Sequence, residues 1–132
     1  MKKILKKIGI VLVILIVAAL LYVIGFGFIK ESSIYVRDYK LSEDGTQIDI
    51  EFINCSSIGF IRKGKITTDG NAINVDFYRA FGGVNGSIGA MDDYVITIDL
   101  NSDTDQISFN RGNSYEQVLV KNNEGNWVKP EV

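Results

Sequence analysis

The side chains that could carry out chemistry in this 132-residue chain are few and scattered. The chain contains no histidine and a single cysteine, Cys55. It therefore lacks the commonest general base and the commonest metal ligand, and no disulfide can form within it. Acid–base catalysis would have to rest on carboxylates, for which Asp76, Asp92 and Asp93 are the candidates. A hydrolase or transferase of this kind needs two carboxylates that converge in one pocket.

One polar stretch, Asn54-Cys55-Ser56-Ser57, carries hydroxyl and thiol groups at the end of a predicted strand. A serine nucleophile without histidine would need an S-x-x-K arrangement, but phenylalanine stands three residues after Ser57. The stretch is more typical of a turn in which serine hydroxyls bond to the backbone. We expect Cys55 to be a small buried apolar residue, and a reactive or intermolecular thiol is the alternative.

The segment Phe81-Gly82-Gly83-Val84-Asn85-Gly86 is rich in glycine but is not a phosphate-binding loop. It lacks the GK[ST] ending and the following helix that would bind phosphate. A connection of this kind is either a ligand-binding loop or a glycine bulge at which a sheet bends. If it is a binding loop, the residues that contact the partner are Arg79, Phe81, Gly82, Gly83, Asn85 and Gly86.

Oxygen ligands recur at Asp99, Asn101, Asp103 and Asp105, the spacing of the first four positions of a calcium loop. Threonine stands where that loop needs glycine, and asparagine stands where it needs a bidentate glutamate. We therefore expect a solvated turn, and the sequence predicts no metal site and no cofactor.

Two further groups of side chains have a functional and a structural interpretation. Arg62, Lys63 and Lys65 form either a partner-facing patch or a charged strand edge that prevents aggregation. The aromatic residues are numerous enough for a sugar-binding platform, although we expect them chiefly to build the core of a domain without disulfides. They are Tyr35, Tyr39, Phe60, Tyr78, Phe81, Tyr115 and Trp127.

The element that positions everything else is an uncharged apolar segment at residues 8–29. As a helix its 22 residues would extend about 33 Å, close to the thickness of the hydrocarbon core of a bilayer. Lys2, Lys3, Lys6 and Lys7 precede it and predict a cytoplasmic N-terminus at residues 1–7. The run is longer than that of most cleaved signal peptides, so we expect an uncleaved signal-anchor in contact with the lipid bilayer. Cleavage within residues 25–33 is the alternative.

The rest of the chain has the alternation of short strands. After a short linker at residues 30–33, residues 34–132 contain eight segments of strand pattern separated by turn signals, including Asp44-Gly45 and Asp69-Gly70. This pattern predicts an all-β domain, an antiparallel sandwich or small barrel of about eight short strands. The eight segments are residues 33–41, 46–53, 59–68, 71–81, 94–100, 106–110, 116–121 and 126–129.

Charge divides at the end of the apolar segment. The first 30 residues contain five lysines and no acidic residue, whereas residues 31–132 contain 9 basic and 16 acidic residues, a net charge of −7. An acidic domain is a poor candidate for binding nucleic acid and is not expected to lie flat on an anionic leaflet.

The segments SSIGFIRKGKI, VDFYRAFGGVNGSIGA and ISFNRGNSYEQVLVKNNEGNW together resemble a group of small, poorly characterised cell-envelope proteins of Gram-positive bacteria. Those proteins carry an N-terminal membrane anchor and a β-rich extracytoplasmic domain. The similarity covers most of residues 55–128. It implies an extracytoplasmic setting at the cell membrane and no known activity.

These observations predict a single-pass membrane protein whose domain acts as a non-enzymatic binding module for an envelope protein or a glycan. An immunity or inhibitor-type role, in which an edge or loop blocks another protein, is the first alternative. A hydrolase built on carboxylates is the second alternative. The sequence does not predict the oligomeric state.

Overall fold

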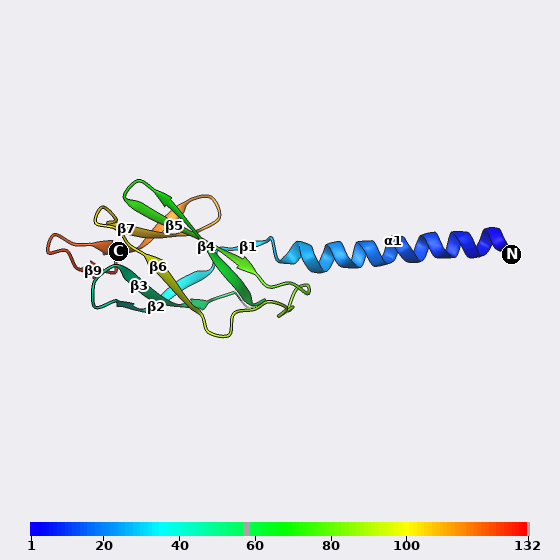
Figure 1. The fold of residues 1–132 in the computed structure, drawn as a ribbon, viewed down its shortest axis with the longest axis horizontal. Helices are drawn as coiled ribbons and strands as arrows, with labels where there is room; N and C mark the ends of the chain where they lie inside the picture. The colour runs from blue at the N-terminus through cyan, green and yellow to red at the C-terminus, as the bar shows by residue number, and fades with distance from the viewer. Residues whose placement is uncertain (57–58, 132) are drawn as a thin grey trace.

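A computed structural model describes residues 1–56 and 59–131. The helix α1, Lys2–Phe26, projects from one end of a β domain, and none of its residues is buried (Figure 1). Within the described residues, α1 is the helix that is long and apolar enough to cross a membrane. It begins before the predicted start at residue 8, because the lysines favour helix, and it ends three residues before the predicted end.

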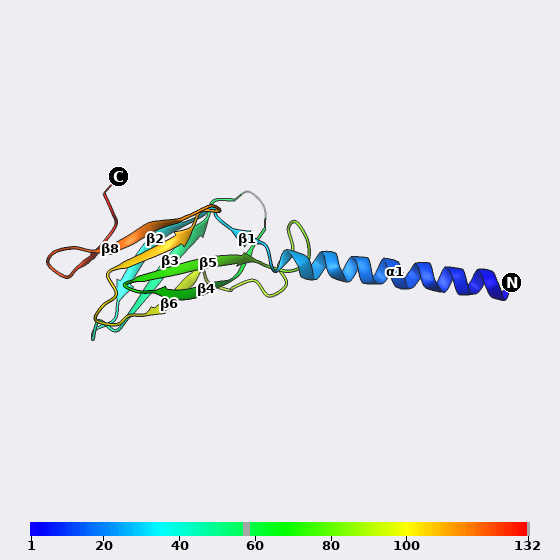
Figure 2. The ribbon, with the colours of Figure 1, turned by 90° about the horizontal axis from the view of Figure 1, so that it is seen from above.

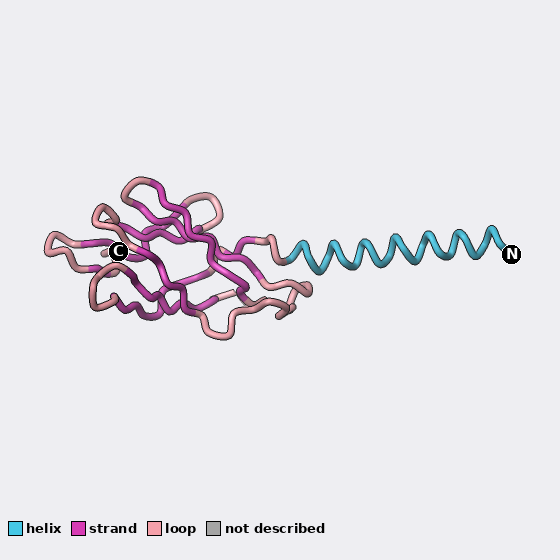
Figure 3. The backbone as a smooth tube through the Cα atoms, viewed as in Figure 1, coloured by secondary structure: helices cyan, strands magenta, loops and turns pink. Residues whose placement is uncertain are grey.

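The β domain contains two sheets, whose strands are magenta in Figure 3. Each of the eight predicted segments contributes a strand. The six-stranded sheet consists of β1 (Lys30–Glu31), β4 (Ile61–Asp69), β5 (Ala72–Arg79), β7 (Gln106–Asn110), β8 (Tyr115–Lys121) and β9 (Trp127–Val128). The three-stranded sheet consists of β2 (Ile34–Leu41), β3 (Gln47–Asn54) and β6 (Val95–Asp99). The ninth strand, β1, corrects the prediction that residues 30–33 are only a linker.

The two predicted hairpin turns are confirmed, with Gly45 at φ 73° and Gly70 at φ 60°. These are left-handed conformations in which glycine carries no steric penalty. At the first turn, Asp44 accepts hydrogen bonds from Ser42 and Thr46. The Ser42 hydroxyl, followed by Thr46, therefore lowers the pKa of the Asp44 carboxyl.

The prediction of a purely antiparallel arrangement is wrong at one pair of strands. β5 and β7 run parallel, with Ala72 opposite Gln106 and Val75 opposite Phe109. Parallel neighbours need a long crossover connection. After β5 the chain leaves the six-stranded sheet, forms β6 in the other sheet and returns, so β7 enters in the same direction as β5.

The core lies between the two sheets and takes alternate residues from each (Figure 2). Phe77 of β5 contacts Phe52 of the other sheet, with the ring centroids 4.6 Å apart, and also Phe109 of β7 at 4.9 Å. Trp127 joins this core as predicted, whereas Tyr35, Phe60 and Tyr115 are exposed and correct the expectation that they build it. These three rings lie on the outside of the domain, away from the core between the two sheets.

We predict that Phe77→Ala lowers the free energy of unfolding by about 3–5 kcal/mol, because it removes the ring that joins the two sheets and leaves a cavity. Urea titration of the full-length protein in detergent micelles measures this. Phe60→Ala removes an exposed ring and is the matched control, with an expected change of about 0.5 kcal/mol. Equal effects of the two substitutions would contradict this account of the core.

Candidate functional site

The glycine-rich loop after β5 packs against the last turns of α1. In both views the loop reaches past the end of the helix and lies alongside it (Figures 1 and 2). The backbone N–H of Gly82 donates to the carbonyl of Val23, with N and O 3.2 Å apart. Gly83 is buried beneath Tyr22, where an added Cβ would lie 2.9 Å from the tyrosine Cε1. The loop is therefore part of the connection between helix and domain.

Arg62 of β4 also takes part in this connection between helix and domain. Its guanidinium donates to the carbonyl of Gly27, and its Cζ lies 4.6 Å from the centroid of the Phe81 ring. Phe81 also packs edge-on against Phe28, with the centroids 6.3 Å apart. A cation at the C-terminal end of a helix is favoured by the helix dipole. We call this cluster the junction: Tyr22, Val23, Gly27, Phe28, Arg62 and Phe81–Gly83.

The end of α1 has few main-chain carbonyls left for water. Ile24, Gly25 and Phe26 accept from the N–H groups three residues later, in tightened final turns. Val23 and Gly27 accept from the domain, as described above, and Ile29 accepts from the N–H of Arg79 at 3.0 Å. A helix leaves its last four carbonyls without partners inside the helix. The domain therefore supplies hydrogen-bond donors to the carbonyls of Val23, Gly27 and Ile29.

An ion pair between a partly buried arginine and a buried glutamate lies next to the junction. Arg79 Nε and Glu31 Oε2 are 3.1 Å apart, and the Glu31 side chain is 5 % exposed. Glu31 Oε1 also accepts from the N–H of Ser33. Glu31 lies on β1, opposite Phe77 of β5. The ion pair with Arg79 therefore helps to hold β1, the strand with which the chain enters the domain, against β5.

The predicted binding residues thus divide into two groups. Arg79, Phe81, Gly82 and Gly83 contact α1 or the residues that follow it. Asn85 is exposed and accepts a long hydrogen bond from Gly59 N–H at 3.4 Å, and Gly86 is half-buried. The role of this loop in binding a partner stays a prediction.

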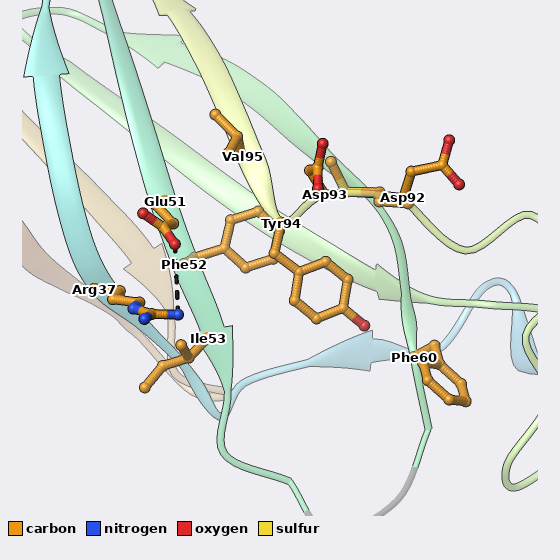
Figure 4. A pocket seen from close by; sticks show the side chains of 10 residues that line it. Arg37, Glu51, Phe52, Ile53, Phe60, Asp92, Asp93, Tyr94 and Val95 are labelled. Atoms are coloured by element: carbon orange, nitrogen blue, oxygen red, sulfur yellow. Dashed lines mark ion pairs between the residues drawn. The ribbon is translucent and has the colours of Figure 1, made fainter.

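A second candidate site lies on the side of the domain, at the end of the three-stranded sheet nearest α1. This cavity, which we call the side groove, has a volume of about 650 Å³. Figure 4 shows the side chains that line it. Tyr94 forms its floor, because its ring stacks on Phe52 at 5.1 Å and its hydroxyl accepts from Ile61 N–H at 3.0 Å. The groove is lined by Arg37, Glu51, Phe52, Ile53, Phe60, Met91, Asp92, Asp93, Tyr94 and Val95.

Three apolar side chains of the side groove are exposed to solvent. Phe60 is 46 %, Val95 41 % and Ile53 40 % accessible. Clustered exposed apolar groups beside a few polar ones are typical of a binding surface. Two of the polar groups, Arg37 and Glu51, pair at 3.5 Å on the rim, and Asp92 and Asp93 are the other charged groups (Figure 4).

The carboxylates of the side groove do not converge. Figure 4 shows Glu51 and Asp92 on opposite sides of the stacked Phe52 and Tyr94 rings. Glu51 is directed towards Arg37, and both Asp92 and Asp93 are exposed. In a carboxylate hydrolase the two carboxyl groups flank one scissile bond, whereas here Glu51 faces Arg37 and is separated from Asp92 by the two rings.

Asp76, the third predicted carboxylate, lies elsewhere, on the outer face of the six-stranded sheet. It is buried and accepts hydrogen bonds from Asn110 at 2.7 Å and from the Tyr115 hydroxyl at 2.9 Å, and Lys30 Nζ is 3.8 Å away. The hydrogen bond to Asp76 is the main cause that raises the pKa of Tyr115. Asp76 therefore serves to hold β1, β5 and β8 together.

The polar stretch at residues 54–57 corrects one expectation. Cys55 is exposed, because it follows β3 in a loop, and is not the buried apolar residue we predicted. The predicted turn is present in its described part, where Asn54 Oδ1 accepts from the N–H of Ser56 at 2.9 Å. Ser57, the possible nucleophile, lies outside the described residues.

The loop at residues 99–105 is held by its own hydrogen bonds. Asn101 Oδ1 accepts from Asp103 N–H at 2.9 Å and from the Thr104 hydroxyl at 3.0 Å, and Thr104 is buried. Asp99 accepts from the side chain of Gln47. The loop is a turn, as predicted. Across residues 1–56 and 59–131, no three acidic or cysteine side chains group as a metal site would require.

The basic cluster separates in space. Lys63 and Lys65 are exposed on β4, which pairs on one side with β5 and has no second partner among the described strands. This position fits the charged-edge interpretation. Arg62, between the same strand and the helix, belongs to the junction.

Compared with known protein families, with curated proteins and with solved structures, this chain matches none. The roles of its residues therefore rest on their own geometry.

Sequence reasoning missed two features of these sites. The link from Arg62 to Gly27 joins positions 35 residues apart, and no local pattern marks it. The side groove did leave a signal: Ile53 and Val95 are apolar residues on the outward, otherwise polar face of β3 and β6.

We predict that Gly27→Ala loosens the junction. Gly27 has an ordinary helical φ of −69°, so alanine causes no backbone strain, but its Cβ would overlap the Phe81 ring. The cost of such overpacking is about 1–3 kcal/mol. Hydrogen exchange of the Gly82 amide in the full-length protein should accelerate at least about fivefold.

The matched control is Gly25→Ala, two residues earlier, where an added Cβ meets nothing within 4 Å. Exchange at Gly82 should stay unchanged in this variant. Acceleration in the control equal to that in Gly27→Ala would show that helix content, and not the contact with Phe81, controls the junction.

Proposed function

We propose that the chain is a single-pass membrane protein, with residues 1–7 in the cytoplasm, α1 as an uncleaved anchor, and a β-sandwich domain outside the membrane. One observation carries this proposal: an apolar helix with no buried residue ends in hydrogen bonds to the domain. The lysines at its start favour the cytoplasmic side. The anchor and the domain thus act as one body.

Within this arrangement the domain is a non-enzymatic binding module of the cell envelope, and its partner is a protein or a glycan. The side groove is the better-supported ligand surface, because it is concave, has a fixed aromatic floor and exposes apolar groups beside an ion pair. The diverging carboxylates argue against the hydrolase alternative. The resemblance to Gram-positive envelope proteins is consistent with this setting, and an immunity or inhibitor role remains the alternative form of the same activity.

The exposed Cys55 offers a test of the topology. A membrane-impermeant maleimide added to intact cells should label the wild-type protein at its single cysteine, and Cys55→Ser should abolish the labelling. Labelling only after the membrane is permeabilised would reverse the proposed orientation. Loss of residues 1–26 from the labelled protein, measured by mass spectrometry, would show cleavage in place of anchoring.

Two isoleucines of equal exposure allow a test of the side groove. A photo-cross-linking amino acid at Ile53 should give a discrete adduct in intact cells, whereas the same group at Ile66 should not. Both side chains are 40 % exposed, but Ile66 lies on β4 outside the groove. Adducts of equal yield at both positions would remove the groove as the specific ligand surface.

A further inference from the structure

We infer that the glycine-rich loop, residues 81–89, together with Phe28 forms a second contact with the outer leaflet of the bilayer, beside the helix. We call this surface the foot. The inference rests on the proposed membrane anchoring and adds a lipid-binding surface on the domain itself.

The position of the loop along the helix determines its depth. If the hydrocarbon core begins at Ile8, after the last lysine of the N-terminus, about 20 residues span it, which places its outer boundary near Gly27. Val23, which accepts the hydrogen bond from Gly82, then lies about 6 Å inside that boundary. The loop is bonded to the helix at this depth, so its neighbouring residues lie at the level of the lipid interface.

The exposed side chains at this level are mainly apolar, with the short polar side chains of Asn85 and Ser87 beside them. Ile88 is 61 % and Val84 42 % exposed, and Phe28 beside them is 67 % exposed. Phe81 and Ile88 form a small antiparallel bridge that holds the loop in a defined shape. Apolar side chains on an ordered loop are an unfavourable surface in water and a favourable one at a bilayer interface.

Four main-chain N–H groups of the loop, those of Phe81, Gly82, Gly86 and Ile88, have main-chain acceptors. The N–H and carbonyl groups of Phe81 and Ile88 bond to each other, at 3.0 and 3.2 Å. Gly86 N–H donates to the carbonyl of Gly83, and Gly82 N–H donates to Val23. Backbone groups near hydrocarbon need such internal partners, because lipid offers none.

The charge of the domain supports lipid headgroups as the occupant of this end. β5 ends at the helix, so the turns at 42–46, 69–71, 99–105 and 122–126 lie at the far end, as the pairing of their strands requires. These four turns contain seven carboxylates and no lysine or arginine. Three cations, Lys30, Arg62 and Arg79, lie at the helix end together with three carboxylates, Glu31, Asp92 and Asp93, so these charges balance there. An anionic leaflet therefore repels the far end more than the helix end.

The test measures the depth of single fluorescent labels in the full-length protein with Cys55→Ser, reconstituted in vesicles that contain anionic lipid. An environment-sensitive dye is attached at Val84→Cys, Ile88→Cys or Val95→Cys, and lipids that carry a nitroxide near the headgroup act as the quencher. Val95 is the matched control, because it is a valine of nearly the same exposure, 41 % against 42 % for Val84, on β6 of the side groove. A fourth label, at Leu20→Cys, reports insertion of the helix.

The inference predicts several-fold stronger quenching at Val84 and Ile88 than at Val95. Quenching at Leu20 with none at Val84 and Ile88 would overturn the foot while leaving the anchor intact. Absence of quenching at Leu20 as well would overturn the proposed anchoring itself. Labels at Val84 and Ile88 that are shielded from aqueous iodide but not quenched by the lipid would show that protein covers the loop, which also overturns the inference.

Discussion

The main-chain carbonyls at the end of α1 impose the constraint on which the rest of the structure depends. The last carbonyls of a helix have no partners in the regular helical pattern. In this chain Ile24, Gly25 and Phe26 accept from N–H groups three residues later, whereas Val23, Gly27 and Ile29 accept from three distant places: the glycine-rich loop, β4 and the end of β5. To deliver these donors, β1 must pair with the C-terminal end of β5, and the loop must fold back beside the helix. These contacts form the joint between helix and domain, and they set the orientation of the domain relative to the helix.

The joint also explains where the chain uses glycine. Gly82 and Gly83 adopt φ values of 105° and 96°, and Gly83 and Gly27 bring backbone against the rings of Tyr22 and Phe81. A side chain at either contact would separate the helix from the domain. The glycine-rich segment thus combines backbone freedom with close approach to the helix.

The structure separates two surfaces with different chemistry. The end of the domain at α1 exposes apolar side chains beside both basic and acidic residues, and the side groove on the three-stranded sheet combines apolar groups with an ion pair. In the proposed function, the hydrogen bonds between helix and domain would set the distance of a ligand in the groove from the helix. The acidic turns lie at the end of the domain away from the helix.

The sequence by itself determined the features that depend on local pattern. The apolar helix, the eight strand segments and the hairpins at Gly45 and Gly70 follow from periodicity and from turn residues within a few positions of one another. The glycines in residues 81–86 also indicated an unusual loop, but they did not indicate that the loop contacts the helix. The exposure of Cys55 was missed, because burial depends on what packs over a residue.

Only the tertiary structure decided which distant residues meet. The parallel pairing of β5 with β7 depends on the chain crossing to the other sheet, and β1 is too short to have a pattern of its own. The junction joins Gly27 to Arg62 and Val23 to Gly82, and the side groove joins Arg37 to Tyr94. Such contacts satisfy hydrogen bonds and cover apolar surface across long separations in sequence, so they arise only when the two sheets and the helix are assembled.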